Sequence, residues 1–403
     1  MAYATKRVFL AFLCGKLLEI SCFCGILIRR INQFYGGIMG YIRQTINFKM
    51  MRNLLFFLGI IIITFIILFK DQNMGDLHQV LMSVDTKFVI FGVCLMIVYY
   101  LIESYNIKAI LKTLGNEISI FSALRYTFIG FFFSAITPAA TGGQPVEVYY
   151  MNKDKISAGD ATMTLLLQLC GFQISTITLG IISAIINPAI LSGGLVWFFV
   201  LGLILNGFAL SLMLICIFSK KATEKLVNTS MKILSFFKAK HLDIRKRNIL
   251  EAMEKYKGGS EFIKSHMMVF VRAVLRVFVQ IIVFYSVTYC TFRAFGLDTY
   301  TYLQILPMQA ILYTIVSGIP LPGAVGVSET AFVTIFGEVF GRGIVKSAML
   351  LNRGVTFYWF VIISLIVVIV TARKKKDVKG EIDEKAFEFE EEVRRLNTSN
   401  IVI

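Results

Sequence analysis

Two short segments of the sequence combine prolines, glycines and a glutamate within apolar surroundings. The first Pro/Gly segment reads TPAATGGQPVEVYYMNKDKIS, from Thr137 to Ser157, and the second reads IPLPGAVGVSETAF, from Ile319 to Phe332. Both contain the pattern P-x-x-x-G, and a glutamate follows it in each. Proline removes a backbone N–H and ends a helix, whereas glycine permits tight turns and close backbone approach. The segments therefore predict two broken helices.

A broken helix at membrane depth can bind an anion. Its free N–H and C=O groups must face protein, water or a polar ligand, because lipid offers them no hydrogen bonds. A helix that restarts after the break directs its N–H groups and positive dipole end at that ligand, which favours a phosphate such as that of a lipid headgroup. The candidate substrate-binding residues are Pro138, Thr141, Gly142, Gly143, Gln144, Pro145, Glu147, Pro322, Gly323, Gly326, Ser328, Glu329, Arg276 and Arg353.

These residues also have structural explanations. The two segments can be ordinary loops between helices, and Glu147 can lie at the membrane interface. Glu329 can be a charge at a helix N-terminus that Ser328 caps. Arg276 either snorkels to the inner surface or pairs with a carboxylate or phosphate. Arg353 is expected to open the final helix from the outer side, as an anchor or as a headgroup partner.

The blocks that flank the segments predict an all-α integral membrane protein, a polytopic helical bundle. The 403 residues are 57% hydrophobic and 16% charged, whereas soluble domains carry about 25% charged residues. Apolar blocks of this kind read as spanning helices. Gln168 lies within one block and is expected to hydrogen-bond to a neighbouring helix. The expected helices cover residues 54–69, 88–102, 121–137, 161–186, 195–218, 269–292, 303–319 and 354–371, with a shorter apolar piece at 331–340.

Basic residues predict the orientation of the chain. Residues 1–53 hold eight Lys/Arg against one acidic residue, and residues 219–266 hold twelve against five, so both are expected to be cytoplasmic. The first Pro/Gly segment then begins and ends inside and the second outside. That arrangement predicts two oppositely oriented re-entrant hairpins of an inverted repeat. We expect a multi-pass protein of the cell (plasma or inner) membrane with a cytoplasmic C-terminus.

The expected organisation has three parts. Residues 1–50 form a basic, amphipathic extension or an extra helix. Residues 51–372 form the transmembrane domain, in which 219–266 is a basic cytoplasmic loop. Residues 373–403 are a charged cytoplasmic tail.

Cofactors and nucleic acid are not indicated. The seven cysteines and three histidines make no metal or disulfide pattern, and no Walker motif is present, so neither a cofactor nor direct ATP coupling is expected. The expected partners are a membrane phospholipid and an anionic lipid surface that contacts 219–266. A homo-oligomer or a lipid-synthase partner is compatible with the sequence.

Several segments resemble the lysylphosphatidylglycerol synthase transmembrane-region family, also described as a flippase-like domain family. The resemblance covers roughly residues 51–372. It is carried by both Pro/Gly segments and by LLLQLCGFQIS and AMLLNRGVTFYW. It implies a helical domain with re-entrant hairpins that moves aminoacylated phosphatidylglycerol to the outer leaflet. In full-length synthases a separate C-terminal domain makes the lipid. Only residues 373–403 follow the last expected helix here, so synthase activity is not expected. Ala324 departs from the family pattern, which often has a second glycine there.

The leading expectation is translocation of an anionic or aminoacylated phospholipid, such as (lysyl)phosphatidylglycerol, by a flippase-like or scramblase-like protein. Two alternatives stay open. One is a membrane-embedded lipid-modifying transferase of the phosphatidylglycerol lysyltransferase type, with Glu147 or Glu329 as its base. The other is a non-transporting partner of a lipid synthase or glycosyltransferase.

Overall fold

The computed structural model is all-helical in the part of the chain that it describes. It describes residues 80–219 and 261–372, together with Leu55 and Gly59, and omits within those ranges positions 138, 139, 141, 193, 262, 320 and 321. No strand occurs among the described residues. The extension 1–50, almost all of the expected helix 54–69, almost all of the loop 219–266 and the tail 373–403 lie outside them.

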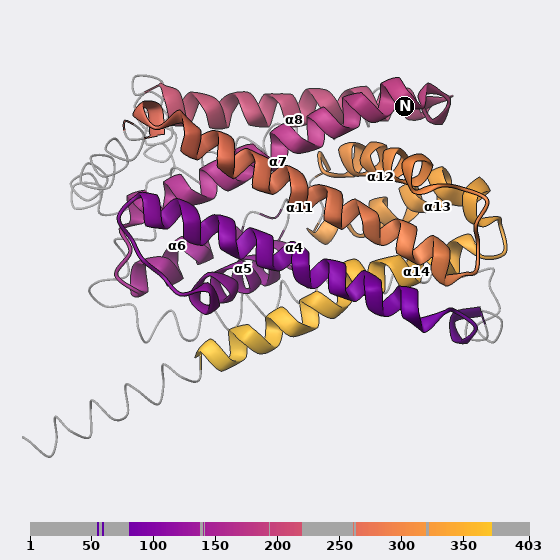
Figure 1. Cartoon of the computed structure of the whole chain (residues 1–403), viewed down its shortest axis with the longest axis horizontal. Helices are drawn as coiled ribbons and strands as arrows, with labels where there is room; N and C mark the ends of the chain where they lie inside the picture. Colours follow the sequence, from indigo (N-terminus) through magenta and orange to yellow (C-terminus); the bar gives the residue numbers. More distant parts are fainter. Residues whose placement is uncertain are drawn as a thin grey trace, which may run out of the picture.

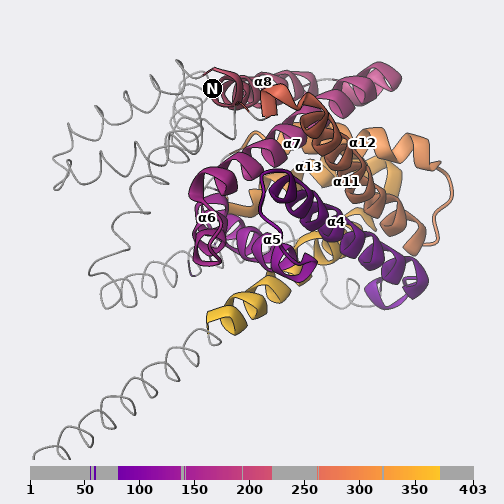
Figure 2. The same cartoon turned by 60° about the vertical axis from the view of Figure 1, so that its left-hand side comes forward.

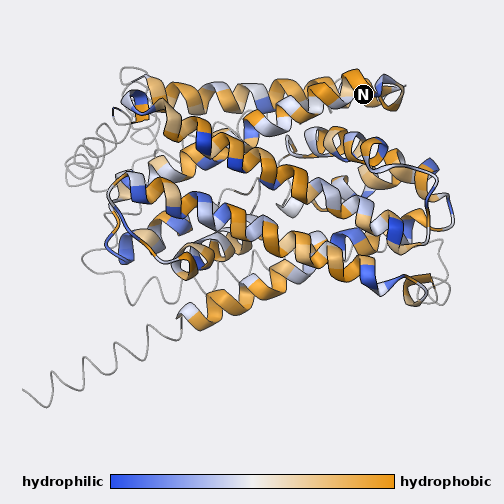
Figure 3. Ribbon diagram, viewed as in Figure 1, coloured by the Kyte–Doolittle hydropathy of each residue, from blue (hydrophilic) through white to orange (hydrophobic). Residues whose placement is uncertain are grey.

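Five described helices are long and apolar enough to cross a membrane (Figure 1). Figure 3 shows apolar residues along much of their length. Large apolar side chains also face outward, as at Trp197, which is 75% exposed, and Ile185, which is 74% exposed. Such surfaces fit lipid rather than water. The polytopic helical membrane protein expected from the sequence is thus confirmed. The five helices are α4 (Thr86–Thr113), α7 (Ala158–Ile186), α8 (Leu195–Phe218), α11 (Met267–Ala294) and Val345–Ala372.

The last of these helices is not regular throughout. It begins as α14 (Val345–Arg353) and continues through one π-helical stretch, η4 (Gly354–Tyr358). It starts nine residues before the expected helix 354–371. The prediction that Arg353 opens the final helix was therefore wrong. Arg353 lies inside the continuous helix, where a π-bulge follows it directly, and such bulges are frequent at functional sites.

Shorter helices lie toward the two ends of the bundle (Figure 1). The first Pro/Gly segment separates α5 from α6, and the second separates α12 from α13. With 11 to 16 residues each, these helices are shorter than the roughly 20 residues that span a bilayer. Their bounds are Ile120–Ala135 (α5), Gly143–Lys153 (α6), Tyr302–Val316 (α12) and Val327–Phe340 (α13), and the single turns are Pro188–Leu191 (η2) and Pro322–Ala324 (η3).

Helices α4 and α11 run side by side through the bundle, and α7 packs against α11 (Figures 1 and 2). Polar side chains connect the three. The Oε1 atom of Gln168 on α7 accepts from Asn106 on α4, and its Nε2 donates to Gln280 on α11 at 3.3 Å. The expected helix–helix hydrogen bond of Gln168 is confirmed. Buried polar residues also explain why α4 continues to Thr113, well past the expected end at 102.

Candidate functional site

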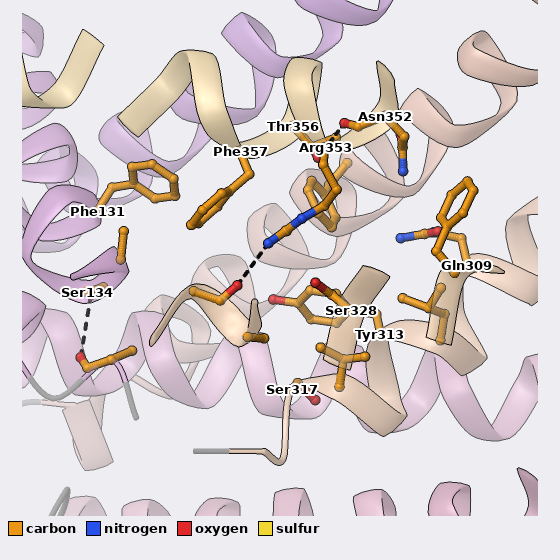
Figure 4. A pocket seen from close by; sticks show the side chains of 18 of the residues that line it. Phe131, Ser134, Gln309, Tyr313, Ser317, Ser328, Asn352, Arg353, Thr356 and Phe357 are labelled. Carbon is orange, nitrogen blue, oxygen red and sulfur yellow. Dashed lines mark hydrogen bonds between the residues drawn. The ribbon is translucent and has the colours of Figure 1, made fainter. Parts of the chain in front are cut away.

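A cavity of about 310 Å³ lies between the ends of the two Pro/Gly segments (Figure 4). Ser134 and Ala140 contribute from the first segment and its preceding helix. Gly323, Ala324 and Ser328 contribute from the second segment. Helices α4, α11, α12 and α14 complete the wall. Segments that are about 180 residues apart in the sequence therefore share one cavity.

The second Pro/Gly segment is a tight turn that brings its backbone to α14 and η4. Gly323 and Gly326 adopt positive φ angles of 57° and 90°, a region that glycine enters without steric cost. Gly323 also lies against an aromatic ring, because a Cβ added there would be 2.4 Å from the Cζ atom of Phe357. Glycine is needed at this position for its backbone angle and for its close contact.

An ion pair ties this turn to α14. The Nε of Arg353 donates to the Oε1 of Glu329 at 2.8 Å, and its Nη2 donates to the carbonyl of Gly323 at 3.0 Å. The guanidinium also lies 4.3 Å from the ring centroid of Phe357. The Arg353 and Glu329 side chains are 15% and 1% exposed. Figure 4 shows Arg353 reaching into the cavity.

Glu329 has a structural role as well as a place behind the cavity. Its Oε2 accepts from the backbone N–H of Gly326 at 2.7 Å and from the hydroxyl of Ser328 at 2.8 Å. Tyr358 donates to its Oε1 at 3.3 Å. Glu329 therefore caps α13, as its alternative explanation predicted. The N-cap residue is Gly326, so the prediction that Ser328 caps the helix was wrong.

The first Pro/Gly segment uses a similar turn. Ala140 has a φ of 55°, and the N–H of Gly142 donates to the hydroxyl of Thr137 at 2.9 Å. A Cβ at Gly143 would lie 1.9 Å from the Oγ of Ser134, so the start of α6 packs directly on α5. Small residues permit this approach, as they do between membrane helices generally.

The structure brings some of the predicted residues together and not others. Gly323, Ser328 and Arg353 line the cavity. Glu329 lies outside the lining and accepts a hydrogen bond from Arg353. Arg276 lies outside the lining and donates to Asn106 instead of to a carboxylate.

The remaining predicted residues belong mostly to α6. Glu147 is only 7% exposed and packs against α5. Gly142, Gly143, Gln144 and Pro145 form the start of α6, outside the cavity lining. Pro138, Thr141 and the side chain of Pro322 lie outside the description.

Sequence reasoning missed most of the cavity wall. Tyr99, Tyr100, Tyr313 and Phe357 give the cavity an aromatic wall. No sequence signal marks them, because aromatic residues also occur throughout the apolar blocks. The polar side chains Gln309 and Asn352, which bond to Thr288 and Thr291, could have been found as buried polar residues in apolar stretches.

This arrangement can hold an anionic group. A guanidinium offers planar, bidentate recognition of phosphate or carboxylate, and here it stands in a partly buried, aromatic setting that strengthens electrostatic attraction. No group of three or more metal-ligating side chains occurs in the described part of the chain.

Ala324 should be a strained position. Its φ of 51° is in the left-handed region, which costs an L-residue with a Cβ about 1–2 kcal/mol. We expect Ala324→Gly to raise the free energy of unfolding by up to about 1 kcal/mol, because the more flexible unfolded chain offsets part of the relief. Thermal unfolding in detergent measures this. Ala331→Gly, in the interior of α13, is the matched control and should lose about 1 kcal/mol. Equal losses in both variants would contradict the expected strain.

The fold and the site define a multi-pass helical membrane protein with an internal cavity between two broken-helix segments. The chain belongs to the lysylphosphatidylglycerol synthase transmembrane-region family, whose match covers residues 54–364. It is also similar to a protein described as "UPF0104 membrane protein" from Archaeoglobus fulgidus, with 26% identity over 100 residues. That match covers 25% of this chain and 30% of the relative. The resemblance inferred from the two Pro/Gly segments is thus confirmed.

Proposed function

We propose that this protein moves a phospholipid with an anionic or aminoacylated headgroup, such as (lysyl)phosphatidylglycerol, across the cell membrane. The observation that carries the proposal is the cavity that both Pro/Gly segments share, with Arg353 reaching into it. The membership of the lysylphosphatidylglycerol synthase transmembrane-region family supports the same class of lipid.

In this proposal the two Pro/Gly segments are re-entrant hairpins that enter the membrane from opposite faces. The helix pair α5–α6 lies toward one end of the bundle and α12–α13 toward the other, which suits such an arrangement (Figure 1). With the C-terminus cytoplasmic, the first hairpin opens to the inner leaflet and the second to the outer leaflet. A headgroup could then reach the cavity from either side.

The cavity suits a headgroup rather than a whole lipid. Its volume of about 310 Å³ is at the lower end for small-molecule pockets. The acyl chains would stay in the bilayer while the phosphate enters. There it would compete with Glu329 for the guanidinium of Arg353, and the aromatic wall would shield it from lipid.

Filling the cavity should stop lipid movement. We expect Thr356→Trp to abolish most of the activity, because Thr356 lines the cavity. Its hydroxyl donates to the carbonyl of Asn352 in its own helix, and it has no other hydrogen bond among the described residues. The measurement uses liposomes that contain headgroup-labelled phosphatidylglycerol and an impermeant quencher. The wild-type protein should make more than half of the label accessible, whereas protein-free vesicles should not.

Ile362→Trp is the matched control on the same helix. Ile362 is 51% exposed and faces outward, so a tryptophan there should leave lipid movement intact. Both variants must elute as single species with unchanged helical circular dichroism. Equal activity of Thr356→Trp and wild type would remove the cavity from the path. Inactive wild-type protein would count against movement of this lipid.

A further inference from the structure

A chain of hydrogen-bonded polar side chains crosses the interior between α4, α7 and α11. Gln280 donates to the Oε2 of Glu103 at 3.1 Å, and Gln280 accepts in turn from Gln168. Beyond Gln168 the chain passes to Asn106, whose Oδ1 accepts from Arg276 at 3.2 Å. Polar residues at such positions are costly in a membrane and usually functional. None of these five residues lines the cavity, so the proposed headgroup site does not explain the network.

A second carboxylate lies near the end of the chain. Glu147 on α6 is 7% exposed and lies on the face of α5 that meets α4 next to Glu103. On that face Ser104 contacts Thr127 at 3.1 Å, and Glu147 packs at Gly130, three residues further along α5. It packs on α5 where Gly130 leaves room, since a Cβ at Gly130 would lie 1.6 Å from its Oε1. Among the described residues no hydrogen-bond donor or cation contacts the Glu147 carboxylate. A buried carboxylate without a partner is strongly disfavoured in its charged form.

The charged groups on the neighbouring helices α5 and α7 bond to residues other than Glu103 and Glu147. Arg125 and Tyr126 on α5 both bond to Asp154. On α7, Asp160 accepts from Asn116 at its own helix N-terminus.

The cations nearest in the interior are also engaged. Arg276 on α11 donates to Asn106, and Arg353 pairs with Glu329. Neither of them forms an ion pair with Glu103 or Glu147, and nor does any other described cation.

Tyrosines are the remaining titratable groups that face Glu103. Tyr99 and Tyr100 lie one turn before it on α4. Tyr313 on α12 packs on Phe284, one turn after Gln280 on α11, and Gln280 bonds to Glu103. All three tyrosines line the cavity. A change of charge at Glu103 is therefore felt at the cavity wall.

Glu103 is half-buried and Glu147 is buried, so the two neighbouring carboxylates oppose each other's ionisation, because their charges repel and little solvent reaches Glu147. A bound cation would remove the repulsion between the two carboxylates. The described residues offer no group of three His, Cys, Asp or Glu side chains for a metal ion. A proton needs only one oxygen.

We propose that Glu147 holds a proton inside the membrane, that Glu103 is the group with which it exchanges this proton, and that the exchange couples lipid movement to a proton gradient. The coupling rests on the proposed function, whereas the proton site does not. Gln280 stabilises the charged form of Glu103 while Glu147 holds the proton. When the proton moves to Glu103, Glu147 becomes charged, and the tyrosines next to Glu103 transmit this change of charge to the cavity.

Infrared spectroscopy of the reconstituted full-length protein tests the proton site without any transport. At pH 7 the wild-type spectrum should contain the C=O stretch of a buried carboxylic acid, and Glu147→Gln should remove it. Glu338→Gln is the control, because Glu338 is exposed on α13 and should not contribute. A wild-type spectrum without the band, or a band that survives Glu147→Gln, would overturn the proposal.

Gly130→Ala provides a second test that keeps the carboxyl group. Its Cβ must displace the Glu147 side chain from its place on α5, so the band should shift in frequency. This variant also decides the matter if Glu147→Gln does not fold. An unshifted band would show that the proton is elsewhere.

A pH gradient across the liposomes tests the coupling. With one proton per lipid, a gradient of one pH unit should change the leaflet distribution of the labelled lipid up to about tenfold. Glu147→Gln should make the distribution insensitive to the gradient. A wild-type distribution that ignores the gradient would overturn the coupling. The absence of any lipid movement, with the infrared band present, would refute the proposed function and leave the proton site standing.

Discussion

Arg353→Leu should destabilise the protein by about 3–5 kcal/mol, because it leaves the carboxylate of Glu329 buried without its cation. The Glu329 side chain is only 1% exposed, and Arg353 supplies its one ion pair in the described part of the chain. The same substitution frees the carbonyl of Gly323 and removes the stacking on Phe357. Thermal unfolding in mild detergent, followed by circular dichroism, measures the loss.

A double-mutant cycle separates the charge from the packing. Glu329→Gln keeps an oxygen that can accept from the N–H of Gly326, but it carries no charge. Added to Arg353→Leu, it should recover part of the lost stability, because no unpaired carboxylate remains. Strictly additive effects of the two substitutions would show that the ion pair does not account for the loss.

Arg353→Lys tests the geometry of the same group. Lysine keeps the positive charge, but it cannot present a planar fork to Glu329 and Gly323 while it stacks on Phe357. We expect lipid movement to fall more than stability does. Full activity with lysine would mean that the site needs only a point charge.

The long helices could be predicted from the sequence because their signal is local. The expected block 195–218 matches Leu195–Phe218 residue for residue, since both of its ends coincide with a change to polar residues. The Pro/Gly segments were also found, because a break in an apolar helix is visible in the residue types themselves. The apolar blocks and the Pro/Gly breaks can both be recognised without knowledge of tertiary contacts.

The predicted helix boundaries were wrong where a helix carries buried polar residues inside the bundle. The expected block 88–102 stops at Glu103, yet α4 continues because Ser104 and Asn106 are buried against other helices. The final helix begins early for a related reason. Ser347 and Asn352 are buried among its neighbours, although the apolar block that predicted this helix begins only at residue 354.

The walls of the candidate site could not be predicted, because they depend on which way side chains point. Tyr313 lines the cavity, whereas Ile311, two residues earlier on the same helix, packs in an apolar cluster outside the lining, and nothing in the sequence separates the two. The approach of Glu147 to Glu103 depends on how α6 folds back along α5. That fold depends in turn on the left-handed residue Ala140 and on the close packing at Gly143.

A contact between α8 and α12 also positions the second Pro/Gly segment. Asn206 donates to the carbonyl of Thr314 at 3.2 Å and to the hydroxyl of Ser317 at 3.0 Å. Ser317 lines the cavity at the end of α12, two residues before the segment begins. The backbones come close because Gly202 faces Thr314. The shape of the cavity therefore depends on a contact that only glycine permits.

Gly202→Ala should disrupt this contact between α8 and α12. A Cβ at Gly202 would lie 2.4 Å from the carbonyl oxygen of Thr314 and 3.2 Å from the Cα of Ile315, and neither backbone atom can rotate away. Such overpacking costs about 1–3 kcal/mol or more, and the separation of α8 from α12 should also lower lipid movement. Gly207→Ala on the same helix has nothing within 4 Å of its Cβ, so it should gain about 0.4–1 kcal/mol from the less flexible unfolded chain. The two alanines should therefore shift the unfolding temperature in opposite directions. A shift of the same sign in both would mean that the helices can separate freely at this point, and that their close approach does not set the position of Ser317.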